Sequence, residues 1–330
     1  MNVLAQKNMK KKKSFREWIK TRKGQQAIII ITFTFIPLLL LFTFTYLPFG
    51  KMVEFSFFRM KYTGPRNFIG FKNYLDIFTR EDTLNALKLS VYYLIGAIVQ
   101  LVAALYFATM LSFKTRGGNF FKGAIFFPYL ISGIAIGFIF KFFYTRGFVL
   151  DSVLQLLGFE LENLPYWLKN TAINNWSLVF SSVWRYMGQN MVLFIGAIMS
   201  VDVEQYEAAK LDGANKMQQF KYIILPSIKT IVLLNLILAV TGSLSAFEPP
   251  YVITKGSNGT ATYFVLMDQL AHEGVQKVGL ASAMAVVLLF IILIITGFQK
   301  MGFKILFNEG DADNGKCKKT LIKSFTKGGK

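Results

Sequence analysis

The side chains in this sequence that could carry out catalysis are few, and the most suggestive spacing lies close to the carboxyl terminus. Residues 310–317, GDADNGKC, have the spacing of a phosphate-binding P-loop, except that Cys317 stands where a serine or threonine would bind magnesium. No strand pattern precedes this segment and no apolar helix follows it, which favours a charged, flexible tail. Because His272 is the only histidine and Cys317 the only cysteine, the sequence predicts no catalytic residue and no metal site.

A second group of polar side chains lies inside stretches that are otherwise apolar. Arg185 falls near the middle of one such run, Gln189 follows one helical turn later on the same face, and Trp184 and Tyr186 flank the arginine. A charge near the centre of a bilayer is costly unless it faces protein, water or a ligand. Arg185 therefore indicates either a structural ion pair, with Glu248 or a neighbouring helix, or a contact with a substrate.

Hydroxyl side chains occur in the same way in the apolar run 228–250. Thr241, Ser243 and Ser245 alternate with small apolar residues shortly before Glu248. In a membrane helix such hydroxyls more often bond to their own backbone than to a ligand. Aromatic rings, amides and hydroxyls are nevertheless the groups that suit sugar rings and sugar hydroxyls, so these positions are candidate contacts along a substrate pathway.

These polar positions belong to a chain whose apolar runs are long enough to cross a bilayer. The 330 residues are 53% hydrophobic and include 34 phenylalanines, which is typical of a helical membrane protein. A membrane-spanning helix needs about 20 apolar residues. The first run lacks the short apolar core and small-residue cleavage site of a signal peptide, so it is expected to be retained. Six runs define an all-α, polytopic membrane protein with six transmembrane helices: 27–47, 89–111, 123–144, 176–199, 228–250 and 279–303.

Prolines and amphipathic segments are expected to shape the ends of these runs. Pro48 should end the first span, and Pro128 should kink the third. Residues 148–157 have the pattern of a short helix lying at the outer interface, where Tyr166 and Trp167 would join the aromatic belt.

The distribution of charge predicts which side of the membrane each loop faces. The net charge is +19, and residues 1–26 carry nine lysines and arginines against one acid, Glu17. Basic residues also gather in the turn after the second span and in the tail, 304–330, whereas the opposite loops are nearly neutral. By the positive-inside rule both termini are cytoplasmic, on either side of a transmembrane domain covering 27–303. The basic excess then reflects topology and anionic lipid, and nucleic-acid binding is not expected.

A polar stretch between the fourth and fifth spans, 201–226, reads as two short helices with a forced break. Asp202 is placed to cap the first helix, Gly213 can end it in the left-handed conformation, and Pro226 should stop the second. An ordinary cytoplasmic loop lying on the membrane surface would show similar amphipathicity.

The spacing within this stretch resembles the coupling loop of sugar-type ABC importer permeases, the maltose and multiple-sugar permease family. The family pattern is E-A-A, three residues, G, nine residues and I-x-L-P, and seven residues match it: Glu207, Ala208, Ala209, Gly213, Ile223, Leu225 and Pro226. The resemblance covers about 67–303, with further matches in NFIGFKNYLDIF, FFKGAIFFPYLISG and YVITKGSNGTAT. The sixth span opens with VGLASA where the family usually has G-Y-A-A-A, and Ser257-Asn258 stands where a G-P pair is common.

The resemblance implies a type I ABC importer permease fold, with 201–226 as a cytoplasmic coupling helix that docks on a separate ATPase. Glu207 would offer a charge to that partner, and Ala208 and Ala209 would allow close approach. Positions near Trp184 to Gln189 and Ser243 to Ala246 match the sugar contacts of maltose-type permeases. Arg185 permits an acidic or sulfated sugar without requiring one.

The partners implied by the resemblance are a second permease subunit forming a heterodimer, an ATPase dimer and an extracellular solute-binding protein. ATP and magnesium would be bound by the ATPase, and this chain would bind no cofactor and do no covalent chemistry. The expected function is import of a carbohydrate, an oligosaccharide in particular, across a bacterial cytoplasmic membrane. Alternatives are a secondary transporter, although the halves show no convincing repeat, a regulatory membrane receptor, or an importer of a polyol or glycerol phosphate.

Overall fold

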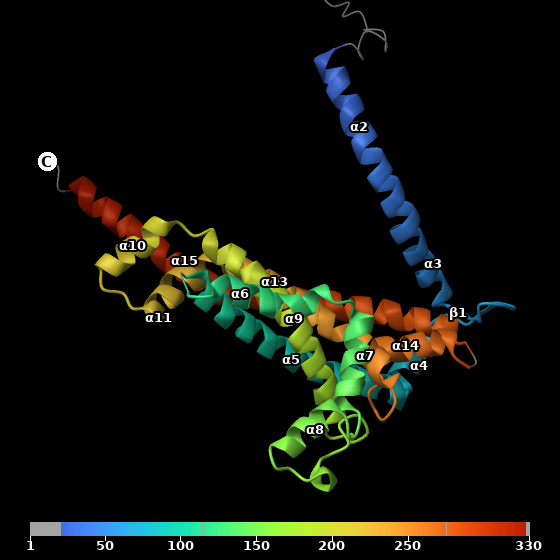
Figure 1. Cartoon of the computed structure of the whole chain (residues 1–330). Coiled ribbons are helices and arrows are strands. Elements are labelled where there is room, and N and C mark those ends of the chain that lie inside the picture. Colours follow the sequence, from blue (N-terminus) through green and yellow to red (C-terminus); the bar gives the residue numbers. More distant parts are fainter. Residues whose placement is uncertain (1–20, 114, 275, 328–330) are drawn as a thin grey trace, which may run out of the picture. The chain divides into compact units, whose positions relative to one another are not determined.

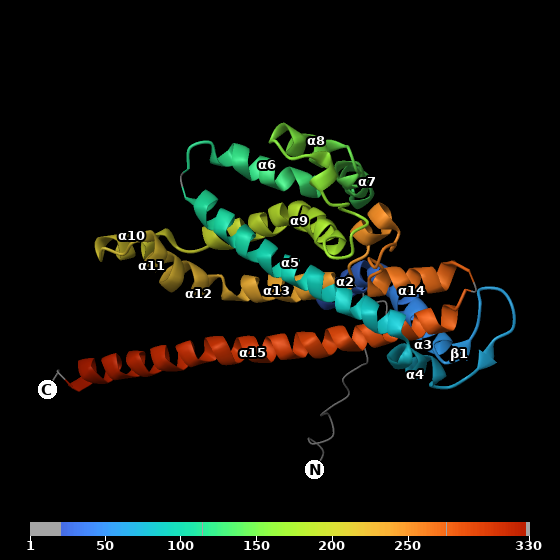
Figure 2. The same cartoon turned by 90° about the horizontal axis from the view of Figure 1, so that it is seen from below.

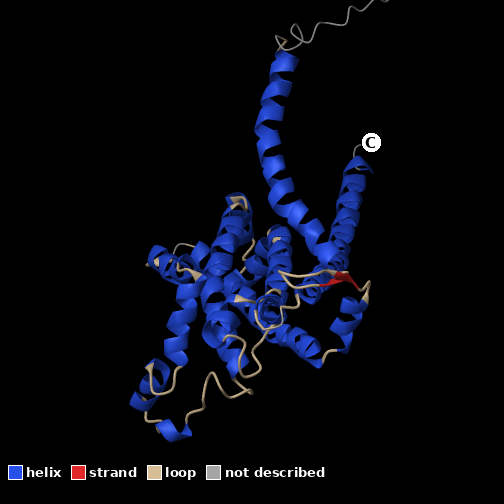
Figure 3. Ribbon diagram, turned by 90° about the vertical axis from the view of Figure 1, so that its right-hand side faces the viewer, coloured by secondary structure: helices blue, strands red, loops and turns tan. Residues whose placement is uncertain are grey.

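The computed structural model describes the backbone of residues 21–113, 115–274 and 276–327. Most of the basic segment predicted for 1–26 and the side chains of the tail from 306 onward lie outside the described residues. The chain divides into two compact units, Met1–Phe55 and Ser56–Lys330. Each unit is almost entirely helical where it is described, and the strands form one hairpin in the second unit (Figure 3).

The first unit is one long helical segment, drawn in blue in Figure 1. It consists of α2 (Arg22–Leu41), the π-helical turn η1 (Phe42–Tyr46) and α3 (Leu47–Phe55). Pro48 does not end this helix as predicted, because α3 continues through it to Phe55.

The second unit begins with a short hairpin and continues with helices (Figures 1 and 2). Its strands pair antiparallel, with Phe58 opposite Phe68. In chain order the elements are β1 (Phe58–Arg59), β2 (Asn67–Phe68), α4 (Lys72–Thr79), α5 (Glu81–Ser112), α6 (Gly118–Leu130), α7 (Gly133–Tyr144), α8 (Val149–Leu156), η2 (Leu161–Asn163), α9 (Asn174–Met199), α10 (Val203–Leu211), α11 (Lys216–Gln219), η3 (Phe220–Ile224), α12 (Leu225–Ser227), α13 (Lys229–Leu244), η4 (Pro250–Thr254), α14 (Tyr263–His272) and α15 (Val278–Lys327).

Helices lie at all six predicted spans, and sharp bends occur inside the third span, just after the fourth and at the start of the fifth. Within the described residues, three continuous helices are long and apolar enough to cross a membrane: Gly24–Phe55, Glu81–Ser112 and Val278–Ile305. Three further spans are helix pairs that change direction at a short break. The pair α6 and α7 is bent by 97°, whereas α9 with α10 and the segment Lys216–Ser227 with α13 are each bent by 73°.

The bends do not fall where the prolines predicted them. An α-helix tolerates an internal proline poorly, because the ring removes one backbone hydrogen bond and clashes with the carbonyl four residues earlier. Here a π-helical turn ends two residues before Pro48 and another ends two residues before Pro226. A π-turn shifts the carbonyl register by one residue, so the helix passes each proline. Pro226 therefore does not stop its helix, which bends at Ile228 instead.

Two other boundaries differ from the sequence prediction. The third span turns after Leu130 and not at Pro128, and Ser132 starts α7 by accepting a hydrogen bond from the Ala135 amide at 3.3 Å. The fifth span loses helical structure after Leu244, before its predicted end at residue 250. Both breaks leave backbone groups inside the bundle that a straight helix would have satisfied internally.

The sequence also made predictions for the segment 148–157, for Trp167 and for the tail. The amphipathic helix predicted over 148–157 is confirmed as α8. Trp167, expected in an aromatic belt, donates from its indole nitrogen to the buried Asp151 carboxylate at 2.7 Å. The tail continues α15 through Lys327, so the backbone of residues 310–317 is helical and its amides do not form a phosphate-binding loop.

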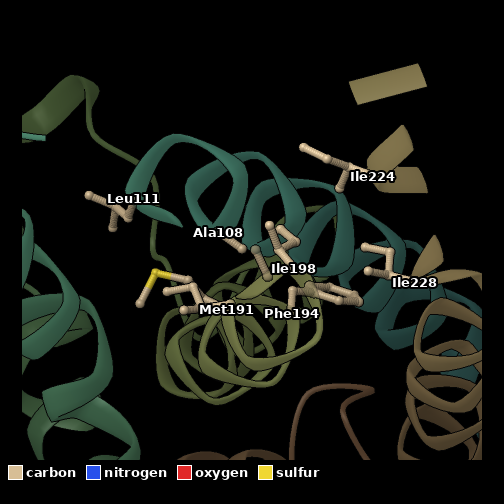
Figure 4. Packing of buried hydrophobic residues seen from close by; sticks show 9 residues of the cluster. Ala108, Leu111, Met191, Phe194, Ile198, Ile224 and Ile228 are labelled. Atoms are coloured by element: carbon tan, nitrogen blue, oxygen red, sulfur yellow. The ribbon is translucent and has the colours of Figure 1, made fainter. Parts of the chain in front are cut away.

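The central packing of the second unit joins α5 to α9. Small residues on α5, Ala104 and Ala108, are fully buried, which lets α9 approach closely with Met191 and Phe194. The same cluster includes Ile224, the last residue of η3, and Ile228, which precedes α13 (Figure 4). Dispersion contacts of this density make the two long helices a rigid frame for the elements at their ends.

Candidate functional site: an exposed helical corner and a cavity between spans

The stretch 201–226 forms a helical corner, which we define as α10, α11 and the turn between them. The corner lies at one end of the second unit, while α4, α14 and the hairpin lie toward the other end (Figures 1 and 2). This arrangement confirms the prediction of two short helices separated by a break.

Gly213 ends α10 in the left-handed conformation, with φ at +80°. The Ala214 amide bonds to the Ala209 carbonyl at 2.9 Å, and the Gly213 amide bonds to the Lys210 carbonyl at 3.1 Å. These two bonds are the Schellman pattern that satisfies carbonyls at a helix end. A Cβ at Gly213 would meet no atom within 4 Å, so glycine is required here by backbone conformation and not by space.

The second helix of the corner has a cap that the sequence reasoning missed. The Asn215 side chain accepts from the Gln218 amide at 2.9 Å, and the Gln218 side chain accepts from the Asn215 amide at 2.8 Å. This reciprocal pair is a capping box. Asp202, the predicted cap of α10, occupies the N-cap position but makes no side-chain capping bond.

One side chain anchors the corner and several others are left exposed. Tyr206 turns inward against the cluster shared by α5 and α9, and its ring contacts Phe113 edge to face with centroids 6.1 Å apart. Burial raises the pKa of the Tyr206 phenol above its ordinary value. On the other side of α10, Glu207 and Ala208 are exposed and Leu211 is 89% exposed. Ala209, Ile223 and Leu225 are half-buried, and Pro226 is exposed.

A cavity of about 490 Å³ lies between α5, α9, α13 and the segment that follows α13. A volume of this size falls within the range of roughly 300–1,000 Å³ usual for small-molecule sites. Five of the predicted pathway residues line it: Tyr186, Gln189, Ser243, Ser245 and Glu248. Helix α5 contributes a third wall that the sequence reasoning missed, and its residues there are Tyr93, Gly96, Ala97 and Gln100.

Two predicted pathway residues lie outside the cavity lining. Trp184 packs on the other side of α9 against Phe140, with ring centroids 5.4 Å apart. Neighbouring helical positions point about 100° apart, so Trp184 and Tyr186 do not share a face. Arg185 lies behind the cavity, where its guanidinium donates a hydrogen bond to the Glu248 carboxylate. The structural ion pair left open by the sequence is therefore present.

The Arg185 end of the ion pair is largely covered by its surroundings, whereas the Glu248 side chain is 42% exposed. Arg185 is 14% exposed, its guanidinium also donates to the Tyr186 hydroxyl at 3.1 Å, and it lies 4.9 Å from the centre of that ring. Gly133, at the start of α7, covers the pair, since a Cβ there would overlap the Glu248 carboxylate. Pairing and cation–π contact together compensate the cost of placing a guanidinium inside a membrane bundle.

The Ser243 hydroxyl in α13 bonds to the backbone of its own helix, as expected in a membrane helix. The Ser243 hydroxyl donates to the Ala239 and Val240 carbonyls, each at 2.9 Å. It lines the cavity but is already satisfied, whereas Ser245 lies just past the end of α13. Within the described residues there is no group of three or more His, Cys, Asp or Glu side chains arranged to hold a metal ion.

In the second unit, a helical bundle that surrounds a cavity with both polar and apolar lining residues, and that carries a rigid corner between the predicted fourth and fifth spans, has the architecture of a membrane transport subunit. The family model of the binding-protein-dependent transport system inner membrane component matches residues 100–301, and the chain belongs to this family. The resemblance drawn from the E-A-A pattern is thereby confirmed, and a secondary transporter is not favoured.

Relatives named as transporter permeases align with most of the chain. The probable ABC transporter permease protein YurN of Bacillus subtilis is 34% identical, covering 83% of this chain and 96% of the relative. The multiple sugar-binding transport system permease protein MsmF of Streptococcus mutans is 30% identical, over 81% of this chain and 92% of the relative. The arabinooligosaccharides transport system permease protein AraP of Bacillus subtilis is 30% identical, over 71% and 75%.

Solved structures show the same fold. A chain of a bacterial alginate ABC transporter, crystallised with an alginate pentasaccharide-bound periplasmic protein, superposes with a TM-score of 0.74. The match covers 86% of this chain and 97% of the other at 19% identity. The predicted type I importer permease fold is therefore confirmed, and this chain is a multi-pass transport subunit.

Proposed function

We propose that this chain is a permease subunit of an ATP-driven importer that moves a carbohydrate, an oligosaccharide in particular, across a bacterial cytoplasmic membrane. The names of AraP and MsmF support a sugar substrate, as does that of AmyD, a probable starch degradation products permease of Thermoanaerobacterium thermosulfurigenes that is 29% identical. The cavity supports it as well, since its polar lining consists largely of amides and hydroxyls.

The observation that carries the proposal is the helical corner. A loop that only connects two spans would not need a left-handed glycine, a capping box and a half-buried tyrosine to hold one fixed shape. Such a shape suits docking: Glu207 and Ala208 face outward, Leu211 offers an exposed apolar anchor, and Glu207 offers a charge to a basic group on the partner. The partner that fits is an ATPase subunit.

The mechanism proposed is alternating access. Closure of an ATPase dimer on ATP moves the corner, and the corner moves α9, which precedes it, and α13, which follows it through η3 and α12. The walls of the cavity then reorient, so that a sugar received from one side meets a path to the other. This chain binds the sugar and transmits force, while ATP and magnesium are bound by the ATPase and no cofactor is bound here.

The remaining partners and the orientation follow from the same proposal. A second, similar permease subunit completes the pore as a heterodimer, and an extracellular solute-binding protein delivers the sugar. The proposed orientation has both termini and the corner in the cytoplasm, and the basic residues near the termini and on the corner support it through the positive-inside rule. The opposite end, with α8 and α14, then faces the binding protein.

Uptake of labelled oligosaccharide by cells expressing the complete transporter tests the proposal. Gly213→Val should abolish uptake while the protein remains in the membrane, because a β-branched residue is strained at φ +80°. Gly213→Asn is the matched control, since asparagine tolerates this conformation, and it should retain most of the activity. Normal uptake by Gly213→Val would contradict coupling through the corner and with it the ATP-driven mechanism.

A further inference from the structure

Resting on the proposed function, we infer that the cavity takes an uncharged carbohydrate and that α5 recognises its hydroxyls through Tyr93 and Gln100. Recognition would then involve three helices and not only the two on either side of the corner.

The charge of the lining supports an uncharged carbohydrate as the ligand of the cavity. Among the described residues that line the cavity, Glu248 is the only one with a charged side chain. Its carboxylate is already engaged by the Arg185 guanidinium and lies 3.4 Å from the Tyr186 hydroxyl. The pair has no net charge. An acidic sugar would have to draw Arg185 away from Glu248, leaving a carboxylate unpaired beside the sugar's own negative charge.

The geometry of α5 supports recognition of the sugar hydroxyls by Tyr93 and Gln100. Tyr93, Gly96, Ala97 and Gln100 stand at positions i, i+3, i+4 and i+7 and therefore lie on one face of the helix. A Cβ at Gly96 would overlap the Val179 side chain, so this glycine lets α5 lie directly against α9. The close contact holds Tyr93 and Gln100, one turn to either side, at the wall of the cavity.

The Tyr93 hydroxyl has an unmet hydrogen bond. The side chain is 5% exposed, and its oxygen is buried with no partner among the described residues. A buried polar group without a partner is unfavourable and uncommon in folded proteins. A rotation of the Tyr93 side chain toward the cavity would let a ligand hydroxyl satisfy it, and the phenol ring adds an apolar face for a sugar ring.

Gln100 supplies the complementary chemistry. This buried amide, 7% exposed, carries two donors and an acceptor. Gln189 and Asn190 bring two further amides from α9 to the same cavity. Amides and phenols that both donate and accept match sugar hydroxyls, which do the same, and they offer an isolated carboxylate or sulfate no compensating positive charge.

Transport assays on the complete complex in proteoliposomes test both halves. The substrates are a labelled neutral oligosaccharide and a uronate-containing oligosaccharide of the same length, each supplied with the binding protein. Wild type should import the neutral sugar in preference. Tyr93→Phe and Gln100→Met, which keep the side-chain volumes similar, should each reduce neutral-sugar transport by about two- to tenfold, as expected for one lost hydrogen bond.

Tyr106→Phe is the matched control, because Tyr106 lies on the same helix but is 61% exposed and outside the cavity lining. It should transport as wild type does. Glu248→Gln would leave Arg185 without its carboxylate, and it should raise the ratio of uronate to neutral-sugar transport. This change is a gain that simple destabilisation would not produce.

The outcomes separate this inference from the proposed function. If wild type imports the uronate sugar in preference, the uncharged class is wrong. If Tyr93→Phe and Gln100→Met match Tyr106→Phe, recognition by α5 is wrong. If wild type imports no carbohydrate under ATP, the proposed function itself fails, whatever the variants do.

Discussion

The helical corner and the cavity achieve rigidity in opposite ways. The corner depends on local chemistry: Gly213 and the Asn215 capping box act within a few residues of sequence, and most of its surface is exposed. The cavity depends on long-range contacts, of which the pair between Arg185 and Glu248, 63 residues apart, is the clearest example. Local devices contribute about 1 kcal/mol each, whereas disrupting buried long-range pairs costs several times more. The two regions should therefore respond very differently to substitution.

The largest effect is expected at the ion pair. Glu248→Leu leaves Arg185, only 14% exposed, without its partner, and should destabilise the detergent-solubilised complex by about 3–5 kcal/mol. Arg185→Leu should cost less, because the Glu248 side chain is 42% exposed and can be hydrated. The double variant should recover much of the loss of Glu248→Leu. Thermal unfolding followed by tryptophan fluorescence measures all three, and additive losses in the double variant would contradict a coupled pair.

The close approach of α6 and α9 should give the next largest effect. A Cβ at Gly188 would overlap the Ile125 carbonyl oxygen, a backbone atom that cannot rotate away. Gly188→Ala should therefore destabilise the protein by about 1–3 kcal/mol, as overpacking usually does. Gly196→Ala on the same helix is the control, because its Cβ would meet nothing within 4 Å and alanine favours the helix. Equal melting temperatures for the two variants would refute the steric argument.

A smaller effect is expected at the anchor of the corner. Tyr206→Ala removes a half-buried ring from the cluster and from Phe113, with an expected cost of about 1–2 kcal/mol. It should also lower the sugar-stimulated part of ATP hydrolysis more than the basal part. Tyr206→Phe should behave as wild type, because the hydroxyl has no hydrogen-bond partner among the described residues. A loss in Tyr206→Phe would show that the phenol oxygen matters.

The smallest effect should come from the caps. Asn215→Ala removes a side chain that accepts a bond from Gln218, and should cost about 1 kcal/mol. Asp202→Ala is the matched test, since Asp202 stands at the N-cap of α10 without bonding there, and its effect should be close to zero. Amide hydrogen exchange in α10 and α11 resolves changes of this size. Faster amide exchange in α10 of the Asp202→Ala variant would show that Asp202 does cap α10, contrary to this assignment.

The sequence was most informative about the corner, for a physical reason. Gly213 adopts its predicted conformation because the determinants of a helix end lie within five residues of it. The six spans were predictable for a similar reason, since the bilayer sets the length of each apolar run. The bends were not predictable in this way, because a π-turn that carries a helix past Pro48 or Pro226 depends on backbone register and leaves no distinct sequence pattern.

The cavity was predicted only in part. Residues on α9 and α13 were found because charges and amides stand out in apolar runs. The wall from α5 was missed because Tyr93 reads as an ordinary core residue, and its role depends on Gly96 lying against Val179, which is 83 residues away. Trp184 was placed on the pathway by adjacency in sequence, although one residue of a helix turns a side chain to another face.

Helix α9 is about three times as long as α10, so the two helices act as the unequal arms of a lever about the bend between them. At 1.5 Å per residue, α9 measures about 39 Å and α10 about 13 Å. If the two arms turn together about the break at residues 200–202, the far end of α9 moves about three times as far as the tip of α10. Tyr186, about 20 Å from the break, moves about one and a half times as far. A hydrogen bond is lost when its atoms separate by less than an ångström. A displacement of about 1 Å at the corner is then sufficient to break a hydrogen bond made by a side chain near the middle of α9.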